Sequence, residues 1–186
     1  MVLRLLPHLL TLARLVAAPV VVWLLVQARF QAALALVLLA GLTDWFDGFA
    51  ARQLGVSGRL GVVLDPLADK ALLVVLFLAL GAIQKLPLWL VALVIGRDLI
   101  IVIGALLLRL FRNIHEFLPS TLGKVSTFFQ IMLVLLVLVH LAFPNQFFWW
   151  LRNTALLLCT VFTAISGIGY VRLGIRLARQ PAIPHS

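Results

Sequence analysis

The sequence predicts an all-α integral membrane protein with six transmembrane helices and with both termini in the cytoplasm. Three observations predict this class: the apolar composition, the length of the apolar segments and the distribution of basic residues. Of the 186 residues, 64% are hydrophobic and 11% are charged, and the mean hydropathy is +1.18. Soluble domains carry about 45–50% apolar and about 25% charged residues. A soluble enzyme and a nucleic-acid-binding module are therefore excluded, despite a net charge of +9.

Six apolar segments are long enough to cross a bilayer, for which a helix needs about 20 mostly apolar residues. Pro7, Pro87 and Pro144 lie at or near segment ends, where proline is tolerated. The connecting loops are short, so we expect residues 1–186 to form a single membrane domain. The predicted spans are 7–27, 31–51, 62–82, 87–109, 122–143 and 149–172.

The ends of these spans have distinct features. Only Arg4 precedes the first apolar run, and no small-residue cleavage site follows it, so we expect a membrane helix and not a removed signal peptide. The second and third spans are joined by about a dozen residues that include Gly55 and Gly58, which permit a tight return. After the last span, the arginines from Arg172 to Arg179 are expected to anchor the helix at the membrane interface.

The basic residues predict the orientation, because cytoplasmic ends of membrane helices are enriched in lysine and arginine. Arg97 lies within the fourth span, and three basic residues, Arg29, Lys85 and Arg152, lie at one set of ends. The other eleven lie at the opposite, cytoplasmic set: Arg4, Arg14, Arg52, Arg59, Lys70, Arg109, Arg112, Lys124, Arg172, Arg176 and Arg179.

Four of the six acidic residues fall within one stretch on this cytoplasmic side: Asp44, Asp47, Asp65 and Asp69. The first two are three residues apart at the end of the second span, and the last two are four apart at the start of the third. Both spacings place the members of a pair on one helix face. Two adjacent antiparallel helices would direct all four carboxylates into one gap.

Four neighbouring carboxylates cannot stay ionised together without compensation, because like charges raise one another's pKa. Oxygen ligands favour a hard divalent cation, or a pair of them, such as Mg²⁺, Mn²⁺ or Ca²⁺. Gly48 and Gly61 allow close approach to the backbone, and Arg52 could hold a phosphate by two parallel hydrogen bonds. The stretch therefore predicts a site for a phosphorylated substrate at the cytoplasmic membrane surface.

At these residues the sequence resembles the CDP-alcohol phosphotransferase, or CDP-alcohol phosphatidyltransferase, family of integral membrane enzymes. The family motif is D-x2-D-G-x2-A-R-x8-G-x3-D-x3-D. Every fixed position is present: Asp44, Asp47, Gly48, Ala51, Arg52, Gly61, Asp65 and Asp69.

The resemblance implies a six-helix enzyme, commonly a homodimer, whose site opens to the cytosol and the inner leaflet of a bacterial inner or plasma membrane. An acceptor hydroxyl attacks the β-phosphorus of CDP-diacylglycerol, and CMP leaves. The resemblance assigns Asp44, Asp47, Asp65 and Asp69 to metal binding, with Mg²⁺ or Mn²⁺ as two ions, and makes Asp69 the general base. It assigns the cytidine diphosphate pocket to Gly48, Ala51, Arg52 and Gly61.

The acceptor is indicated by weaker similarities. The opening Leu6–Arg14 and the Gly-Lys-x2-Thr element around Lys124 resemble phosphatidylglycerophosphate synthases, although His8 replaces their Asn. This ranks glycerol-3-phosphate first. Arg97-Asp98, followed by Gly104-Ala105, looks more like cardiolipin synthases, which ranks phosphatidylglycerol second. Serine and inositol are not excluded.

The candidate acceptor-binding residues are Arg97, Lys124 and Arg109. Because adjacent residues do not share a helix face, we expect Arg97 to hold an acceptor phosphate while Asp98 pairs elsewhere, for instance with Arg14 or Arg109. The alternative is a structural ion pair within the membrane. For Arg109 the alternative is an interface anchor.

Two other classes of protein are disfavoured. A cation channel or transporter would need acidic residues along a path, whereas these cluster at one membrane face. A scaffold that only binds the CDP-lipid would lack the base, whereas Asp69 is present.

Overall fold

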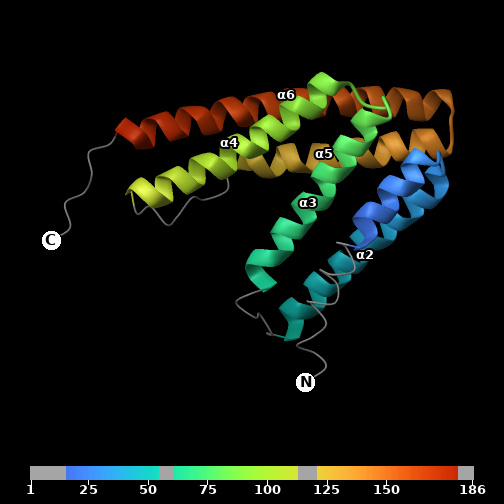
Figure 1. Cartoon of the computed structure of the whole chain (residues 1–186), viewed down its shortest axis with the longest axis horizontal. Coiled ribbons are helices and arrows are strands. Elements are labelled where there is room, and N and C mark those ends of the chain that lie inside the picture. Colours follow the sequence, from blue (N-terminus) through green and yellow to red (C-terminus); the bar gives the residue numbers. More distant parts are fainter. Residues whose placement is uncertain (1–15, 55–60, 113–120, 180–186) are drawn as a thin grey trace. The chain divides into compact units, whose positions relative to one another are not determined.

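The computed structural model describes residues 16–54, 61–112 and 121–179 (Figure 1). Within these ranges the side chains of 44–54, 61–69, 105–112 and 177–179 are not described. The described residues form helices joined by turns and contain no strand. The helices are a segment at 16–26, α2 (Phe30–Leu54), α3 (Gly61–Ala82), α4 (Leu88–Arg112), α5 (Thr121–Ala142) and α6 (Gln146–Arg179).

The predicted all-α class is confirmed over the described residues. Helices α2 to α5 begin and end within three residues of the predicted second to fifth spans. Of the predicted first span, 7–27, only the part from residue 16 is described. Helix α6 is longer than the predicted span 149–172, since it begins at Gln146 and continues to Arg179.

The start of α6 has a local cause. Asn145 follows Pro144, and its side-chain Oδ1 accepts a hydrogen bond of 2.9 Å from the backbone N–H of Phe148. An asparagine in this position satisfies an N–H group that lacks a partner in the first turn of a helix. The prediction placed the boundary at the aromatic residues and overlooked this cap.

Two of the described helical segments are long and apolar enough to cross a membrane: Thr121–Ala142 and Gln146–Arg176. Three shorter apolar stretches accompany them, at Val16–Val26, Phe30–Thr43 and Lys70–Ala82. These features indicate a membrane protein. The full count of six spans and the orientation of the termini stay predictions.

Contacts divide the chain into two compact units. Unit 1 consists of residues 1–86 and 134–149, and unit 2 of residues 87–133 and 150–186. In unit 1, apolar side chains from four segments are buried, among them Leu25, Leu34, Phe77 and Val137. The side chain of Gln31 also donates a hydrogen bond of 3.4 Å to the carbonyl oxygen of Ala142, which joins α2 to the end of α5.

Unit 2 has a different interior. Its buried apolar residues include Leu90 and Val94 on α4 and Leu133 on α5. The phenyl rings of Phe129 on α5 and Phe162 on α6 stack with centroids 4.7 Å apart. Between these helices lie buried polar side chains: Arg97, Asp98, Ser126, Gln130, Thr163 and Ser166.

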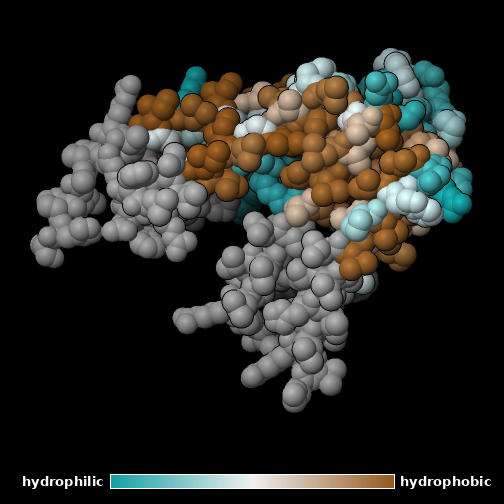
Figure 2. Space-filling model, in the orientation of Figure 1, coloured by the Kyte–Doolittle hydropathy of each residue, from teal (hydrophilic) through white to brown (hydrophobic). Residues whose placement is uncertain are grey.

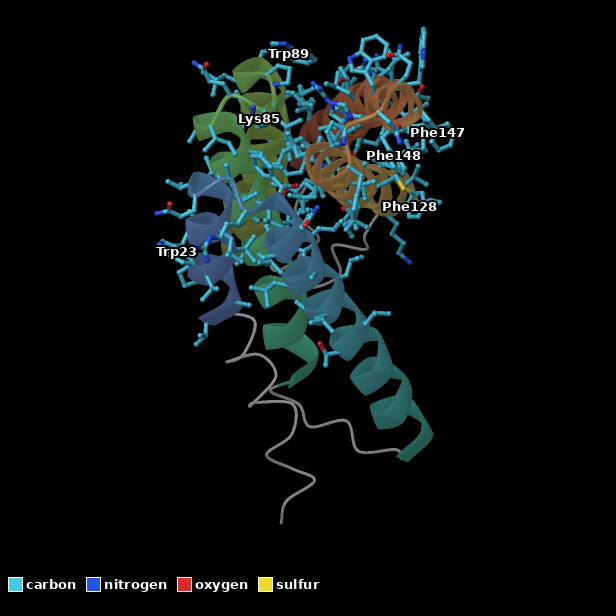
Figure 3. All side chains as sticks on the ribbon, turned by 90° about the vertical axis from the view of Figure 1, so that its right-hand side faces the viewer. Trp23, Lys85, Trp89, Phe128, Phe147 and Phe148 are labelled. Atoms are coloured by element: carbon cyan, nitrogen blue, oxygen red, sulfur yellow. The ribbon has the colours of Figure 1, made fainter. Side chains whose placement is uncertain are left out.

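Large apolar side chains are also exposed along the described helices. Examples are Leu39 on α2 (62% exposed), Leu99 on α4 (53%) and Leu157 on α6 (62%). In the space-filling view, apolar residues coloured brown cover most of the coloured surface (Figure 2). The aromatic side chains of Trp23 and Phe147 point outward from their helices (Figure 3). Soluble monomers rarely expose such continuous apolar surface, whereas lipid covers it readily.

Two helix ends are closed by the same hydrogen-bond pattern. After the 16–26 helix, Ala28 adopts a φ of 55°. Its N–H donates to Leu25 O (3.1 Å), and the N–H of Arg29 donates to Leu24 O (2.9 Å). At the end of α3, Gln84 (φ 57°) and the following residue repeat this pattern. This is the Schellman motif, in which glycine is the usual residue at the position of positive φ.

Ala28 therefore offers a test of the turn. Replacement by glycine, Ala28→Gly, should stabilise the protein by about 0.5–1 kcal/mol, because glycine adopts positive φ without the steric cost of a Cβ. The measurement is thermal unfolding of the purified protein in detergent. The matched control is Ala35→Gly, at an exposed position within α2, which should destabilise by a similar amount. A loss of stability in both variants would contradict the assigned turn.

Candidate active site

The acidic motif lies on two consecutive helices of unit 1. Asp44 and Asp47 belong to the C-terminal half of α2, and Asp65 and Asp69 to the N-terminal half of α3. At a rise of 1.5 Å per residue, the first two lie about 4.5 Å apart along the axis and the second two about 6 Å apart. The backbone is helical at all four positions, as the assignment of each pair to one helix face requires. The contacts of the four side chains lie outside the described residues.

The two acidic ends of these helices are close along the chain. Residues 55–60 connect α2 to α3, so the Cα atoms of Leu54 and Gly61 are separated by at most about 25 Å. The C-terminal end of α2 and the N-terminal end of α3 lie at the same end of unit 1 (Figure 1). The backbone therefore brings both acidic pairs to one end of two antiparallel helices.

Thr43 immediately precedes the motif. Its hydroxyl donates to backbone carbonyls of the preceding turn, those of Leu39 and Ala40 (3.2 Å to the latter). Such bonds to the carbonyls of the preceding turn are common for threonine within helices. The hydroxyl proton of Thr43 is thus directed into α2.

The remaining predicted donor-site residues share these two helices. Gly48, Ala51 and Arg52 lie on α2, and Gly61 is the first residue of α3. Arg52 follows Gly48 by four residues, which is about one helical turn, so the two lie on the same face. Their side-chain contacts also lie outside the described residues.

Arg97 is the centre of the buried polar cluster in unit 2. Its side chain is 4% exposed. Nε and Nη2 both donate to Ser166 Oγ, at 3.2 and 3.0 Å. Nη2 also donates to the carbonyl oxygen of Gly123 at 3.2 Å, and Nη1 to Asp98 Oδ1 at 2.7 Å. One guanidinium from α4 thereby contacts both α5 and α6.

The expectation that Arg97 and Asp98 would not meet is wrong. Their Nη1 and Oδ1 atoms form a buried ion pair. Successive Cβ atoms diverge by about 100° around a helix, but the long arginine side chain can turn back toward the neighbouring carboxylate. The alternative of a structural ion pair therefore describes the observed contact, and an acceptor-binding role for Arg97 stays a prediction.

The other two candidates for acceptor binding differ from Arg97. Lys124 is exposed on the first turn of α5, directly after the buried Gly123. Arg109 lies near the end of α4, and the contacts of its side chain are outside the described residues. Of these candidates, Lys124 is thus the one whose described side chain is open to a ligand.

Sequence reasoning missed the polar partners in unit 2. Ser126 Oγ and Thr163 Oγ1 are 3.1 Å apart, and Gln130 Nε2 donates to Thr163 at 3.4 Å. The signal was present in the spacing: polar residues recur every three or four positions along both apolar helices, which places them on one face of each. On α5 these are Ser126 and Gln130, and on α6 Thr163, Ser166 and Tyr170.

Comparison with known proteins decides the family. A family model of CDP-alcohol phosphatidyltransferases matches residues 4–165, which includes every motif position. The chain belongs to this family. The predicted family is thus confirmed, and the matched region includes the motif on α2 and α3.

Relatives of this phosphatidyltransferase carry two kinds of name. A CDP-diacylglycerol–glycerol-3-phosphate 3-phosphatidyltransferase from Aquifex aeolicus is 31% identical over 176 residues, which are 92% of this chain and 96% of that protein. A chloroplastic protein of the same activity name from rice is 35% identical over 76% of this chain. A cardiolipin synthase (CMP-forming)/mitochondrial hydrolase fusion protein from Schizosaccharomyces pombe is 35% identical over 75% of this chain.

The matched regions cover different shares of these relatives. They make up 48% of the rice protein and 26% of the S. pombe fusion protein. The relatives therefore include proteins named for each of the two predicted activities, transfer to glycerol-3-phosphate and synthesis of cardiolipin.

Proposed function

We propose that this protein transfers a phosphatidyl group from CDP-diacylglycerol to glycerol-3-phosphate, with release of CMP. The observation that carries the proposal is the complete eight-residue motif on α2 and α3, together with the relation to the A. aeolicus enzyme over nearly the whole length of both chains. The hydroxyl oxygen of the acceptor forms a bond to the β-phosphorus of the donor. The bond from that phosphorus to the bridging oxygen breaks, and CMP carries the oxygen away.

We assign the steps to residues of this chain. Asp69 takes the proton of the attacking hydroxyl, since its acidic neighbours keep it basic. Arg52 holds a phosphate of the donor by paired hydrogen bonds. Gly48, Ala51 and Gly61 leave space for the cytidine diphosphate to approach the backbone.

The donor set fits a divalent cation. Four carboxylates in two helix-register pairs offer only oxygen ligands, which suit Mg²⁺ or Mn²⁺. Asp44, Asp47, Asp65 and Asp69 would hold it, or two such ions. When bound, the metal neutralises the donor pyrophosphate and the charge that develops on the departing CMP.

The same proposal includes the membrane arrangement. Six spans with both termini in the cytoplasm would place the motif at the inner leaflet of a bacterial inner or plasma membrane, where the lipid donor is accessible. The excess of basic residues at the predicted cytoplasmic ends supports this orientation. We further propose that the active form is a homodimer, as the family resemblance implies.

A second candidate function is cardiolipin synthesis, with phosphatidylglycerol as the acceptor. The relation to the S. pombe fusion protein and the Arg97-Asp98 and Gly104-Ala105 pairs favour it. The motif does not discriminate between the two, because it concerns the donor that they share. Glycerol-3-phosphate ranks first because the A. aeolicus relative matches almost the whole of this chain.

The reaction requires both the metal and the base. With CDP-diacylglycerol, glycerol-3-phosphate and Mg²⁺ or Mn²⁺ in detergent, the purified protein should release CMP, and EDTA should abolish the release. Asp69→Asn should lower kcat about 10²–10⁴-fold, the usual contribution of a general base. Glu116→Gln, a carboxylate outside the motif, is the matched control and should keep its activity. CMP release in EDTA or by Asp69→Asn at the wild-type rate would refute the assignment.

Lys124 is proposed to bind the acceptor phosphate. Lys124→Ala should raise the KM for glycerol-3-phosphate about tenfold, as expected for one lost charge-assisted hydrogen bond, and leave the KM for CDP-diacylglycerol nearly unchanged. Lys85→Ala removes an exposed lysine from the predicted opposite side and is the matched control. An altered KM for the donor with an unchanged KM for the acceptor would contradict this role.

A further inference from the structure

Lys124, the candidate residue for binding the acceptor, follows Gly123, whose backbone carbonyl is hydrogen-bonded by a side chain of another helix. The carbonyl oxygen of Gly123 accepts hydrogen bonds from Arg97 Nη2 on α4 (3.2 Å) and from Thr127 Oγ1 on α5 (3.1 Å). α5 begins at Thr121, so this carbonyl belongs to its first turn. First turns lack part of the hydrogen bonding of a helix interior and fray easily. The bond from Arg97 therefore restrains the segment that carries Lys124.

Ser166 fixes Arg97 in the orientation that makes this bond. Its Oγ accepts from both Nε and Nη2, so two atoms of the planar guanidinium are held by one hydroxyl. Nη2 is shared between Ser166 and Gly123. Loss of the hydroxyl would leave Nε of a buried arginine without this acceptor and free the plane of the guanidinium to rotate.

Two further residues of α6, Gly167 and Tyr170, lie beside the Arg97 side chain. Gly167 lies against its stem: a Cβ built on this glycine would be 3.7 Å from Arg97 Cγ, which is an ordinary contact distance. The guanidinium carbon lies 5.7 Å from the ring centre of Tyr170, within the range of a cation–π interaction. Three residues within five positions of α6 therefore lie against Arg97: Ser166, Gly167 and Tyr170. Of these, Ser166 is the hydrogen-bond acceptor.

Thr163, a neighbouring polar residue, takes no part in the hydrogen bonds that join Ser166, Arg97 and Gly123. Thr163 is on α6, three positions before Ser166, and is fully buried. Its hydroxyl contacts Ser126 and Gln130 on α5 but makes no bond to Arg97 among the described residues. Thr163 is therefore a matched control, because it lies on the same helix as Ser166, is buried to a similar degree and lies outside the link to Gly123.

We propose that Ser166 is a positioning residue for the acceptor: through Arg97 and the carbonyl of Gly123, it sets the position of Lys124. Ser166 itself does not touch the substrate. This inference rests on the proposed function of Lys124 and adds the residues that determine its geometry. All four residues belong to unit 2.

The kinetic test is a double-mutant cycle with glycerol-3-phosphate. Ser166→Ala should raise the KM for the acceptor about five- to tenfold, because a hydrogen bond to a charged group is lost, and change the KM for CDP-diacylglycerol less than twofold. In the Lys124→Ala background the same substitution should change the acceptor KM less than twofold, since the residue through which it acts is gone.

Two further variants are controls for this cycle. Thr163→Ala should leave the acceptor KM unchanged, and Ser166→Thr, which keeps a hydroxyl, should have an acceptor KM close to that of the wild type. Equal effects of Ser166→Ala in both backgrounds, or an equal effect of Thr163→Ala, would overturn the inference.

A second measurement does not depend on activity. A nitroxide spin label attached to Lys124→Cys in lipid nanodiscs reports the mobility of the first turn of α5; the native Cys159 is buried and should not react. Ser166→Ala should sharpen the spectrum of the label, and Thr163→Ala should not. Identical spectra for Ser166→Ala and the parent would overturn the inference even in an active enzyme. If no acceptor yields CMP, the proposed function fails, and the label still decides whether Ser166 positions residue 124.

Discussion

The helices of this chain are so apolar that each charge among them requires a dedicated partner. Arg97 shows how strict this requirement is. At 4% exposure its guanidinium would be very costly to desolvate alone, and it is met by a carboxylate, a hydroxyl and a backbone carbonyl from three helices. Satisfying one charge therefore fixes the mutual placement of α4, α5 and α6 within unit 2.

The same requirement explains the acidic motif. Four aspartates on the ends of α2 and α3 cannot compensate one another, because their charges have the same sign. Within unit 2 compensation comes from the protein; for the motif we propose that it comes from divalent cations and the phosphates of the substrate. The charge of Arg97 is satisfied within the fold and serves the structure, whereas we propose that the charges of the motif serve ligand binding.

Sequence reasoning succeeded where information is local. Apolar segment length located α2 to α5, and the spacing of the aspartates led to the family that comparison confirmed. It failed at the Arg97–Asp98 pair, because a rule about Cβ directions neglects the reach of a long side chain. It also missed Ser166, whose contact with Arg97 joins residues 69 positions apart. The spacing along α6 places Ser166 on the polar face of that helix, but its pairing with Arg97 depends on how α4 and α6 pack, which hydropathy and spacing do not contain. The start of α6 was missed because a single capping side chain, Asn145, outweighs the apolar pattern.

We propose that the chain makes phosphatidylglycerophosphate from a CDP-linked lipid. The most direct measurement offers the purified protein CDP-diacylglycerol together with ¹³C-labelled glycerol-3-phosphate and phosphatidylglycerol at equal concentrations, and identifies the lipid products by mass spectrometry. We expect labelled phosphatidylglycerophosphate as the main lipid product, with one CMP released for each molecule formed. Cardiolipin as the main product would contradict the choice of acceptor, and the absence of any lipid product would contradict the reaction itself.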